Sequence, residues 1–179
     1  QIGDFYLGGI IFYLDGNGGG KVCALEDKPT PIEWTLPAYQ DTTVPGVGAR
    51  SDTDGAANTD AIIAQTGLAA ANTYAAGLCR LYNTPGNNDL GQWYLPAKGE
   101  LDLMWINLAD SDGDGVNYGL DDPNNIGNFE RATYWSSTES GSDIWSYHEH
   151  AWIQLFNIGI QANGNKYLFT SPVRAVRAF

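Results

Sequence analysis

The sequence predicts an α+β fold, and three observations favour it. Short apolar runs near both ends of the chain lie between turns rich in Gly, Asp and Asn, as strands do. The middle of the chain carries apolar residues at helical spacing. The chain contains neither an internal repeat nor a linker, so we expect residues 1–179 to form one domain. A domain of this length can bury roughly 70% of the surface of its unfolded chain.

The first expected strands form a hairpin near the N-terminus. Residues 8–14 are a short apolar run that ends in the Gly-rich turn 15–20, and residues 22–25 supply the partner strand. Residues 28–56 are rich in Pro, Gly, Asp and Thr and show no period. That composition predicts a long ordered loop.

Helices are expected in the middle of the chain. Asn58-Thr59-Asp60 is typical of a helix start, and the helix should run to about Gln65, break at Gly67 and resume through Leu81. A later helix begins after Pro96, which is tolerated there. Its predicted core stripe consists of Leu101, Met104, Trp105 and Leu108.

Strands are expected again in the last part of the chain, over residues 133–137, 151–156, 166–170 and 172–178. Because side chains alternate along a strand, Trp152 shares a face with Gln154 and Phe156. If Trp152 faces the core, Ile153 and Leu155 face solvent. We further expect the first apolar strand, residues 8–14, to pair with the last.

Composition excludes some partners. Acidic residues outnumber basic ones 21 to 9, for a net charge of −12, whereas nucleic acids and anionic membranes bind a positive face. No apolar run reaches the ~18 residues of a membrane-spanning helix. The balance is typical of an exported protein or of one that handles cations. Cys23 and Cys79 are too few for a disulfide scaffold; they are either buried thiols or, as we expect for an extracellular protein, one bridge.

An acidic run after the third helix is spaced like a calcium loop. In a twelve-residue loop of this kind, oxygen ligands come from positions 1, 3, 5, 7 and 12, with Gly at position 6. The corresponding residues here are Asp110, Asp112, Asp114, the carbonyl of Val116, Asp121 and, at position 6, Gly115. We expect Ca²⁺ here, bound weakly because the last ligand is Asp instead of Glu. The alternative is a solvated Asp/Gly turn.

Three segments carry a resemblance to a known family. They are residues 93–101 (Trp-Tyr-Leu-Pro-Ala-Lys-Gly-Glu-Leu), 134–139 (Tyr-Trp-Ser-Ser-Thr-Glu) and 173–177 (Val-Arg-Ala-Val-Arg), with Ala151-Trp152 between the last two. In this order they resemble the bacterial collagen-like-protein C-terminal domain family. The resemblance implies a C-type-lectin-like fold of the formylglycine-generating-enzyme subtype, with paired terminal strands, flanking helices and a ligand-binding loop face. The same order of segments is also similar to that of variable receptor-binding proteins made by diversity-generating retroelements.

Two details of these segments bear on structure. The family often has Ser where this chain has Ala97. Because the Ala97 side chain cannot accept a hydrogen bond, the free backbone N–H groups at the helix start must find other acceptors. Arg174 and Arg177 are expected to be buried partners of Glu139 or Glu100, with an architectural role.

The expected ligand-binding surface lies in residues 140–170. Aromatic and aliphatic residues fill the segments that the family pattern leaves unspecified, and such clusters mark binding surfaces when exposed. The expected contact residues are Trp145, Tyr147, His148, His150, Ile153, Leu155, Ile158, Tyr167 and Phe169. His148 and His150 have the spacing of a metal pair, but no third ligand is evident, so a binding role is favoured.

The function expected from the sequence is non-catalytic binding. We see no catalytic constellation, and the cysteine pair of the related formylglycine-generating enzymes is missing from the C-terminal part. We expect an adhesin or receptor-binding tip that recognises a cell-surface protein or carbohydrate, outside the cell on a bacterial surface or a phage tail tip, without inserting into a membrane. The alternative is a structural or trimerisation cap at the end of a fibre.

Overall fold

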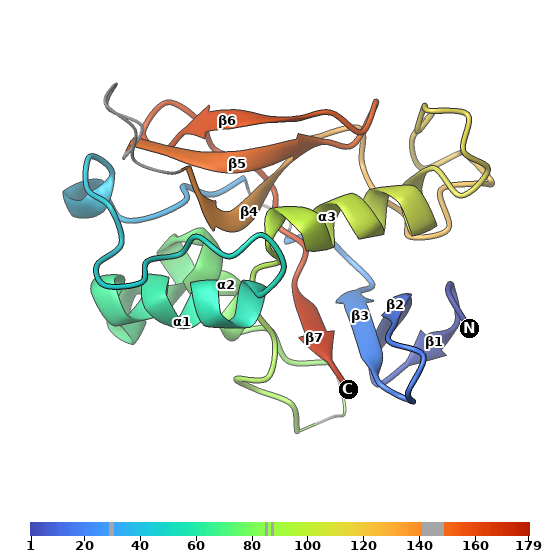
Figure 1. Ribbon diagram of the computed structural model, residues 1–179, viewed down its shortest axis with the longest axis horizontal. Coiled ribbons are helices and arrows are strands. Elements are labelled where there is room, and N and C mark those ends of the chain that lie inside the picture. Colours follow the sequence, from blue (N-terminus) through green and yellow to red (C-terminus); the bar gives the residue numbers. More distant parts are fainter. Residues whose placement is uncertain (29–30, 85, 87, 141–148) are drawn as a thin grey trace.

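The computed structural model describes residues 1–28, 31–84, 86, 88–140 and 149–179, and it has the expected α+β architecture (Figure 1). Two antiparallel sheets lie on opposite sides of a central helix. The terminal sheet has the order β1-β2-β3-β7, from strands Phe5–Tyr6, Gly9–Leu14, Gly20–Ala24 and Val176–Ala178. The β4–β6 sheet has the order β4-β5-β6, from strands Thr133–Glu139, His150–Leu155 and Gln161–Asn165.

The helices fill the space between and beside the sheets. α3 (Lys98–Met104), extended by a π-helical turn at Trp105–Ala109, contacts strands of both sheets (Figure 1). α1 (Gly55–Thr66), a 3₁₀ segment (Leu68–Thr73) and α2 (Ala75–Arg80) pack together beside β4. A 3₁₀ turn, Pro37–Tyr39, lies in the long loop that precedes α1.

The two ends of the chain meet in the terminal sheet, but in a different order from the one expected. β7 pairs with β3, with Val22 opposite Arg177, and not with β2. The free side of β2 is taken by β1, where Phe5 lies opposite Ile10. The expected direct pairing of residues 8–14 with the last strand is therefore wrong, although both strands belong to one sheet.

The start of α1 lies earlier than the sequence suggested. Asp54 is the N-cap, because its carboxylate accepts a hydrogen bond from the Ala57 N–H at 2.9 Å. Asn58 is instead buried inside the helix and hydrogen-bonds the backbone of Ser51. The helix does end where Gly67 takes a positive φ of 86°, a conformation that glycine adopts without strain.

As expected, the backbone N–H groups at the start of α3 find acceptors other than the side chain of residue 97. The Lys98 N–H donates to Thr138 Oγ1 at 3.0 Å, and the Gly99 N–H donates to the Asp52 carbonyl at 2.8 Å. Glu100 supplies the other half of a capping box by accepting the Ala97 N–H at 2.7 Å. Of the predicted core stripe, Leu101, Met104 and Leu108 are fully buried, whereas Trp105 is partly exposed.

The last two strands differ from the prediction, the first of them in position and the second in length. β6 covers Gln161–Asn165, and residues 166–170 form a turn in which Asn165 Oδ1 accepts the N–H groups of Tyr167 and Leu168. Asn side chains favour such turns by hydrogen-bonding the backbone two residues ahead. Within 172–178, only Val176–Ala178 is strand.

Both faces of β5 are covered, whereas one of them was predicted to face solvent. Ala151, Ile153 and Leu155 pack into a hydrophobic core cluster together with Trp135, and Ile153 is only 8% exposed. The opposite face meets α3 through polar contacts, for example from Gln154 Nε2 to Asp102 Oδ1 at 3.2 Å. Trp152 is half-buried on that face. The expectation that Ile153 and Leu155 face solvent is therefore wrong.

Buried ion pairs fix the architecture, with partners other than those expected. Arg174 Nε lies 2.5 Å from Asp27, and Arg177 Nη1 lies 3.1 Å from Asp89. The predicted partners are taken by lysines: Lys166 Nζ contacts Glu139 at 2.6 Å, and Lys21 contacts Glu100. The structural role of both arginines agrees with the prediction, whereas their assignment to Glu139 or Glu100 was wrong.

The two cysteines are free thiols, so the expected bridge is wrong. Cys23 and Cys79 are both fully buried, but they belong to different hydrophobic clusters. Burial raises the pKa of the Cys23 thiol to about 11 and that of the Cys79 thiol to about 12.

Candidate functional site

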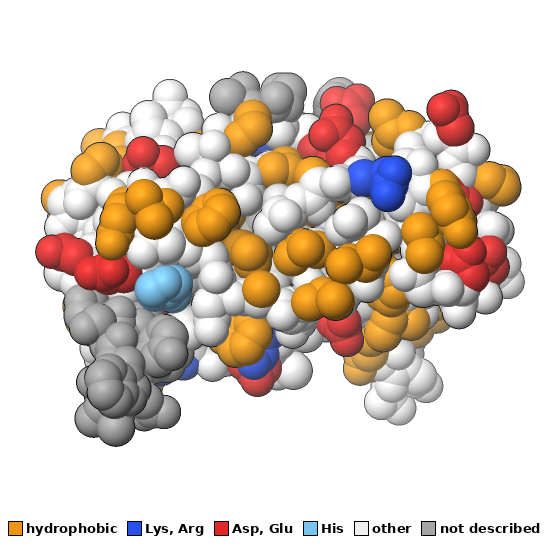
Figure 2. All heavy atoms as spheres, turned by 90° about the horizontal axis from the view of Figure 1, so that it is seen from above, with side chains coloured by type: hydrophobic (Ala, Val, Ile, Leu, Met, Phe, Trp, Pro, Cys, Tyr) orange, Lys and Arg blue, Asp and Glu red, His pale blue; other side chains and the backbone are white. Residues whose placement is uncertain are grey.

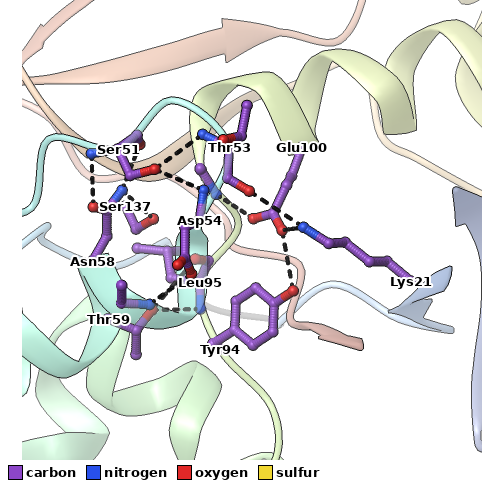
Figure 3. Close-up of polar contacts among 12 residues, drawn as sticks. Lys21, Ser51, Thr53, Asp54, Asn58, Thr59, Tyr94, Leu95, Glu100 and Ser137 are labelled. Carbon is purple, nitrogen blue, oxygen red and sulfur yellow. Dashed lines mark hydrogen bonds and ion pairs between the residues drawn. The ribbon is translucent and has the colours of Figure 1, made fainter. Parts of the chain in front are cut away.

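A buried polar network supports the β4–β6 sheet from below (Figure 3). Glu100 is buried on α3, and one carboxylate oxygen accepts from Lys21 Nζ and from the Tyr94 hydroxyl, the latter at 3.0 Å. Its other oxygen accepts the Ala97 N–H. Burial and the Glu100 charge raise the pKa of the Tyr94 phenol. Since both oxygens have partners within the fold, this network positions α3 and is better described as architecture than as a reactive site.

A second part of the network holds the loop before α1 against β4. Asn58 Nδ2 donates to the Ser51 carbonyl at 2.7 Å and to Ser137 Oγ at 3.3 Å (Figure 3). The Thr138 hydroxyl donates to the same Ser51 carbonyl at 2.9 Å. The polar half of the Tyr-Trp-Ser-Ser-Thr-Glu segment thus anchors a loop and a helix, which explains why polar residues occupy a buried strand.

The acidic run after α3 brings three carboxylates together. Asp110, Asp112 and Asp114 each offer an oxygen, and these oxygens lie within 4.8 Å of one another. The loop has the tight turns that convergence requires, because Gly113 and Gly115 have φ of 74° and 84°. These three residues could therefore hold a metal ion.

Hydrogen bonds from the loop backbone orient the carboxylates. Both Asp110 oxygens accept the Gly115 N–H at 3.2 Å, and Asp114 accepts the Val116 N–H at 2.8 Å. Asn124 Nδ2 donates to Asp112 at 2.7 Å. Burial, and then the negative charges of Asp114 and Asp112, raise the pKa of Asp110 against the opposing effect of Gly115. A cation placed between the carboxylates would relieve that repulsion.

The rest of the predicted calcium loop is not assembled in the same way. Asp121 is exposed and does not belong to the group of three carboxylates. The chain between them turns at Tyr118, whose N–H donates to Asp122 Oδ2 at 3.0 Å. Each of the three carboxylates contributes one converging oxygen, whereas calcium usually takes six to eight oxygen ligands, which favours weak binding.

The predicted ligand-contact residues are only partly placed. Trp145, Tyr147 and His148 lie outside the described residues. His150 is half-buried at the start of β5, and Ile153 and Leu155 point into the core. The remaining three are exposed: Ile158 by 41%, and Tyr167 and Phe169 by 48% each.

Two further exposed apolar residues, one before and one after β6, were missed in the sequence. Ile160 is 55% exposed in the turn between β5 and β6, and Leu168 is 71% exposed in the turn after β6. Alternation could not identify them, because both lie in turns where no strand period holds. Together with Ile158, Tyr167 and Phe169 they form what we call the β6 flanks.

Figure 2 looks onto this side of the molecule. Hydrophobic side chains form a broken row across the face, and acidic side chains gather toward both of its ends. The face therefore combines apolar contact surface with negative charge.

One aromatic residue on β5 is combined with charges. The Lys98 ammonium lies 4.1 Å from the centre of the Trp152 ring and 3.1 Å from Asp52 Oδ2. Gln161 Nε2 closes the group by donating to the Lys98 carbonyl at 2.7 Å. The sequence assigned Trp152 to the core, and only the packing of α3 on β5 reveals this partly exposed group.

Comparison with known proteins locates the fold. No family model matches the chain, and no curated protein matches it either. Among solved structures it is similar to a fimbrial protein from Bacteroides ovatus, with 17% identity and a TM-score of 0.60. The match covers all of this chain and 49% of that one, so the chain spans about half the length of the protein it matches. This likeness concerns the fold.

No described helix is both long and apolar enough to cross a membrane.

Proposed function

We propose that the chain is a non-catalytic binding module, an adhesin-like or receptor-binding tip domain that recognises a cell-surface protein or glycan outside the cell. The β6 flanks carry the proposal: five large apolar side chains, each at least 41% exposed, occur within twelve residues. Exposed apolar groups gathered on one part of a surface are a recurrent property of binding sites. The C-type-lectin-like assignment, which rests on the sequence resemblance, belongs to this proposal and agrees with ligand binding through loops.

A triple variant tests the proposal. Tyr167→Ala, Leu168→Ala and Phe169→Ala together should lower binding of the labelled domain to intact bacterial or animal cells, or to an immobilised glycan panel, by tenfold or more. Aromatic and aliphatic anchors usually dominate such interfaces. The melting temperature should change little, since all three side chains are solvent-exposed.

Phe5→Ala is the matched control, because Phe5 is 65% exposed on the terminal sheet, away from the β6 flanks. Equal binding by the wild type, the triple variant and the control would contradict the proposal. A stable trimer in sedimentation, with the β6 flanks protected from solvent in the absence of any ligand, would support the alternative of a trimerisation cap.

We also propose that the carboxylates of Asp110, Asp112 and Asp114 bind Ca²⁺. The hard oxygen donors, their convergence within 4.8 Å and their mutual repulsion support a divalent cation of this kind. Calorimetry after chelation should detect one weak site. Because a ligand that binds only the native state stabilises it by mass action, added Ca²⁺ should raise the melting temperature.

Two variants test which carboxylates bind the ion. Asp112→Asn combined with Asp114→Asn should abolish the heat of binding and the thermal shift. Asp121→Asn should leave both largely intact, since Asp121 stands outside the group of three. Absence of a calcium-dependent shift in the wild type would refute the site, and loss of binding in Asp121→Asn would restore the longer calcium loop.

A further inference from the structure

The outer edge of β6 presents backbone groups to solvent. The β5–β6 ladder is bracketed by hydrogen bonds from Leu155 N–H to the Ile160 carbonyl at 2.9 Å and from Lys166 N–H to the Glu149 carbonyl at 2.7 Å. In an antiparallel pair, residues that bond the partner strand alternate with residues that point away. Ala162 and Gly164 therefore face β5, and Gln161 and Asn163 direct their N–H and C=O groups outward. The carbonyl of Asn165 is already occupied, because it accepts the Phe169 N–H at 3.3 Å.

The other sheet edges in the described part of the chain are closed. On β4, the outward N–H groups of Trp135, Ser137 and Glu139 donate to the carbonyls of Pro172, Pro96 and Ala49. β7 exchanges two 2.9 Å hydrogen bonds with Tyr94, and β1 has only two residues. β6 is a five-residue strand at the end of its sheet, and no described residue covers its backbone at Gln161 or Asn163 in this way.

β6 also lacks the features that usually protect an edge from pairing. Its sequence, Gln-Ala-Asn-Gly-Asn, contains neither a charge nor a proline, and its register with β5 runs without a bulge. Gly164 keeps the strand flat against the core, because a Cβ there would lie 2.8 Å from Ile153 and from the Trp135 ring. The edge is thus a ready template for another strand.

Charge near the edge restricts the partner. Glu149 accepts from the Tyr167 hydroxyl at one end of β6, and Asp102 accepts from Gln154 near the other end. Neither carboxylate forms an ion pair with a described residue. Figure 2 places acidic side chains toward both ends of this face. A second copy of the chain, with the same charge of −12, would be repelled.

We propose that the β6 edge binds an extended strand of a partner protein, uncharged over about five residues and flanked by Lys or Arg. Five residues of strand span about 13 Å from first to last Cα at ~3.3 Å per residue, so basic residues five or six positions apart reach both acidic ends. The exposed Ile160 and Leu168 then contact the partner's apolar side chains. This inference rests on the proposed binding function and specifies its partner as polypeptide.

The test uses a random library of displayed nine-residue peptides, selected on the full chain, with amide hydrogen exchange as the readout. In the free protein, Ala162 and Gly164 should be protected, whereas Gln161 and Asn163 should exchange fast. Selected peptides should be basic at both ends and should slow exchange at Gln161 and Asn163.

Asn163→Pro removes the outward N–H, which an edge strand tolerates, and should weaken peptide binding at least fivefold. Asn163→Ala keeps the N–H and is the matched control, expected to bind within twofold of wild type. The melting temperatures of both variants check that the sheet stays folded.

The inference is overturned by failure to select any peptide, by protection at amides other than the outward ones, or by equal loss of binding in both Asn163 variants. Outward amides already protected in a dimer without peptide would also overturn it, in favour of a second copy. Binding of the domain to cells or glycans in any of these cases would leave the proposed function standing. If the domain also failed to bind cells and glycans, both the inference and the proposed function would be refuted.

Discussion

The terminal sheet and the β4–β6 sheet differ in how they end. In the terminal sheet, β7 is covered through its bridge to Tyr94, and β1 is reduced to two residues. In the β4–β6 sheet, β4 is covered by three carbonyls from other segments, whereas β6 is open and flanked by exposed apolar residues. The terminal sheet therefore ends in one covered strand and one very short strand, whereas the β4–β6 sheet has one covered edge and one longer open edge.

Charged side chains follow the same division. Arg174–Asp27, Arg177–Asp89 and Lys21–Glu100 all tie the terminal sheet to neighbouring loops and helices. In the β4–β6 sheet, the buried Lys166–Glu139 pair joins the segment after β6 to the covered strand β4. Among the described residues, the ion pairs therefore involve no residue of β6 itself.

Removing residues 172–179 should have the largest effect, because it deletes β7 together with the fully buried Val173, Val176 and Arg174. We expect loss of the cooperative thermal transition followed by circular dichroism. Deleting Phe179 alone is the control and should leave the transition in place. An unchanged melt after the longer deletion would mean that the terminal sheet does not need its last strand.

Arg174→Ala should destabilise the domain by about 3–5 kcal/mol, the usual cost of breaking a buried pair. Arg174 donates to Asp27 and to the carbonyls of Ala24, Gly127 and Asn128, all of which would lose a donor. Arg131→Ala, at an exposed position, should change the free energy of unfolding by less than about 0.5 kcal/mol. Urea denaturation of both variants checks the contrast, and equal midpoints would contradict it.

Much of the fold could be predicted because strong local signals agreed with tertiary packing. The N-terminal hairpin, the break at Gly67 and the apolar residues of α3 follow from turn residues and periodicity. The acidic spacing predicted the convergence of Asp110, Asp112 and Asp114, since alternate side chains of a tight loop meet. Sequence patterns were reliable where one short segment determined the result.

The features of the fold that were predicted wrongly or missed depend on contacts between segments distant in sequence. Which arginine pairs with which acid, and which strand lies beside β7, is determined by packing that no local pattern encodes. The outward orientation predicted for Ile153 was wrong because it assumed that only the face of Trp152 is covered. Polar α3 residues cover that face, and Ile153 packs into the core on the other. The exposed Ile160 and Leu168 lie in turns, where periodicity carries no information.

A pair of isoleucines sharpens the contrast within the β4–β6 sheet. Ile153→Ala removes a side chain that packs into the core beside Trp135, and it should cost about 2–5 kcal/mol of unfolding free energy. Ile158→Ala removes a side chain that is 41% exposed and should cost less than about 1 kcal/mol. Denaturant titration of the two variants checks the orientation of β5. Equal costs, or the reverse order, would restore the outward orientation predicted for Ile153.

The smallest effect concerns proton binding by the buried thiols, one of which, Cys23, lies on β3 of the closed sheet. The folded state raises the thiol pKa from the ordinary 9.0 to about 11 for Cys23 and about 12 for Cys79. Between pH of about 9 and 11 the unfolded chain releases protons that the native state keeps, so the unfolding free energy falls as pH rises. Each thiol contributes at most about 1.4 kcal/mol per pH unit. Urea titrations across this window should reveal the slope, and Cys79→Ala should reduce it while lowering stability at every pH. A slope that is unchanged in this variant, or rapid alkylation of both thiols in the native protein at neutral pH, would mean that solvent reaches them.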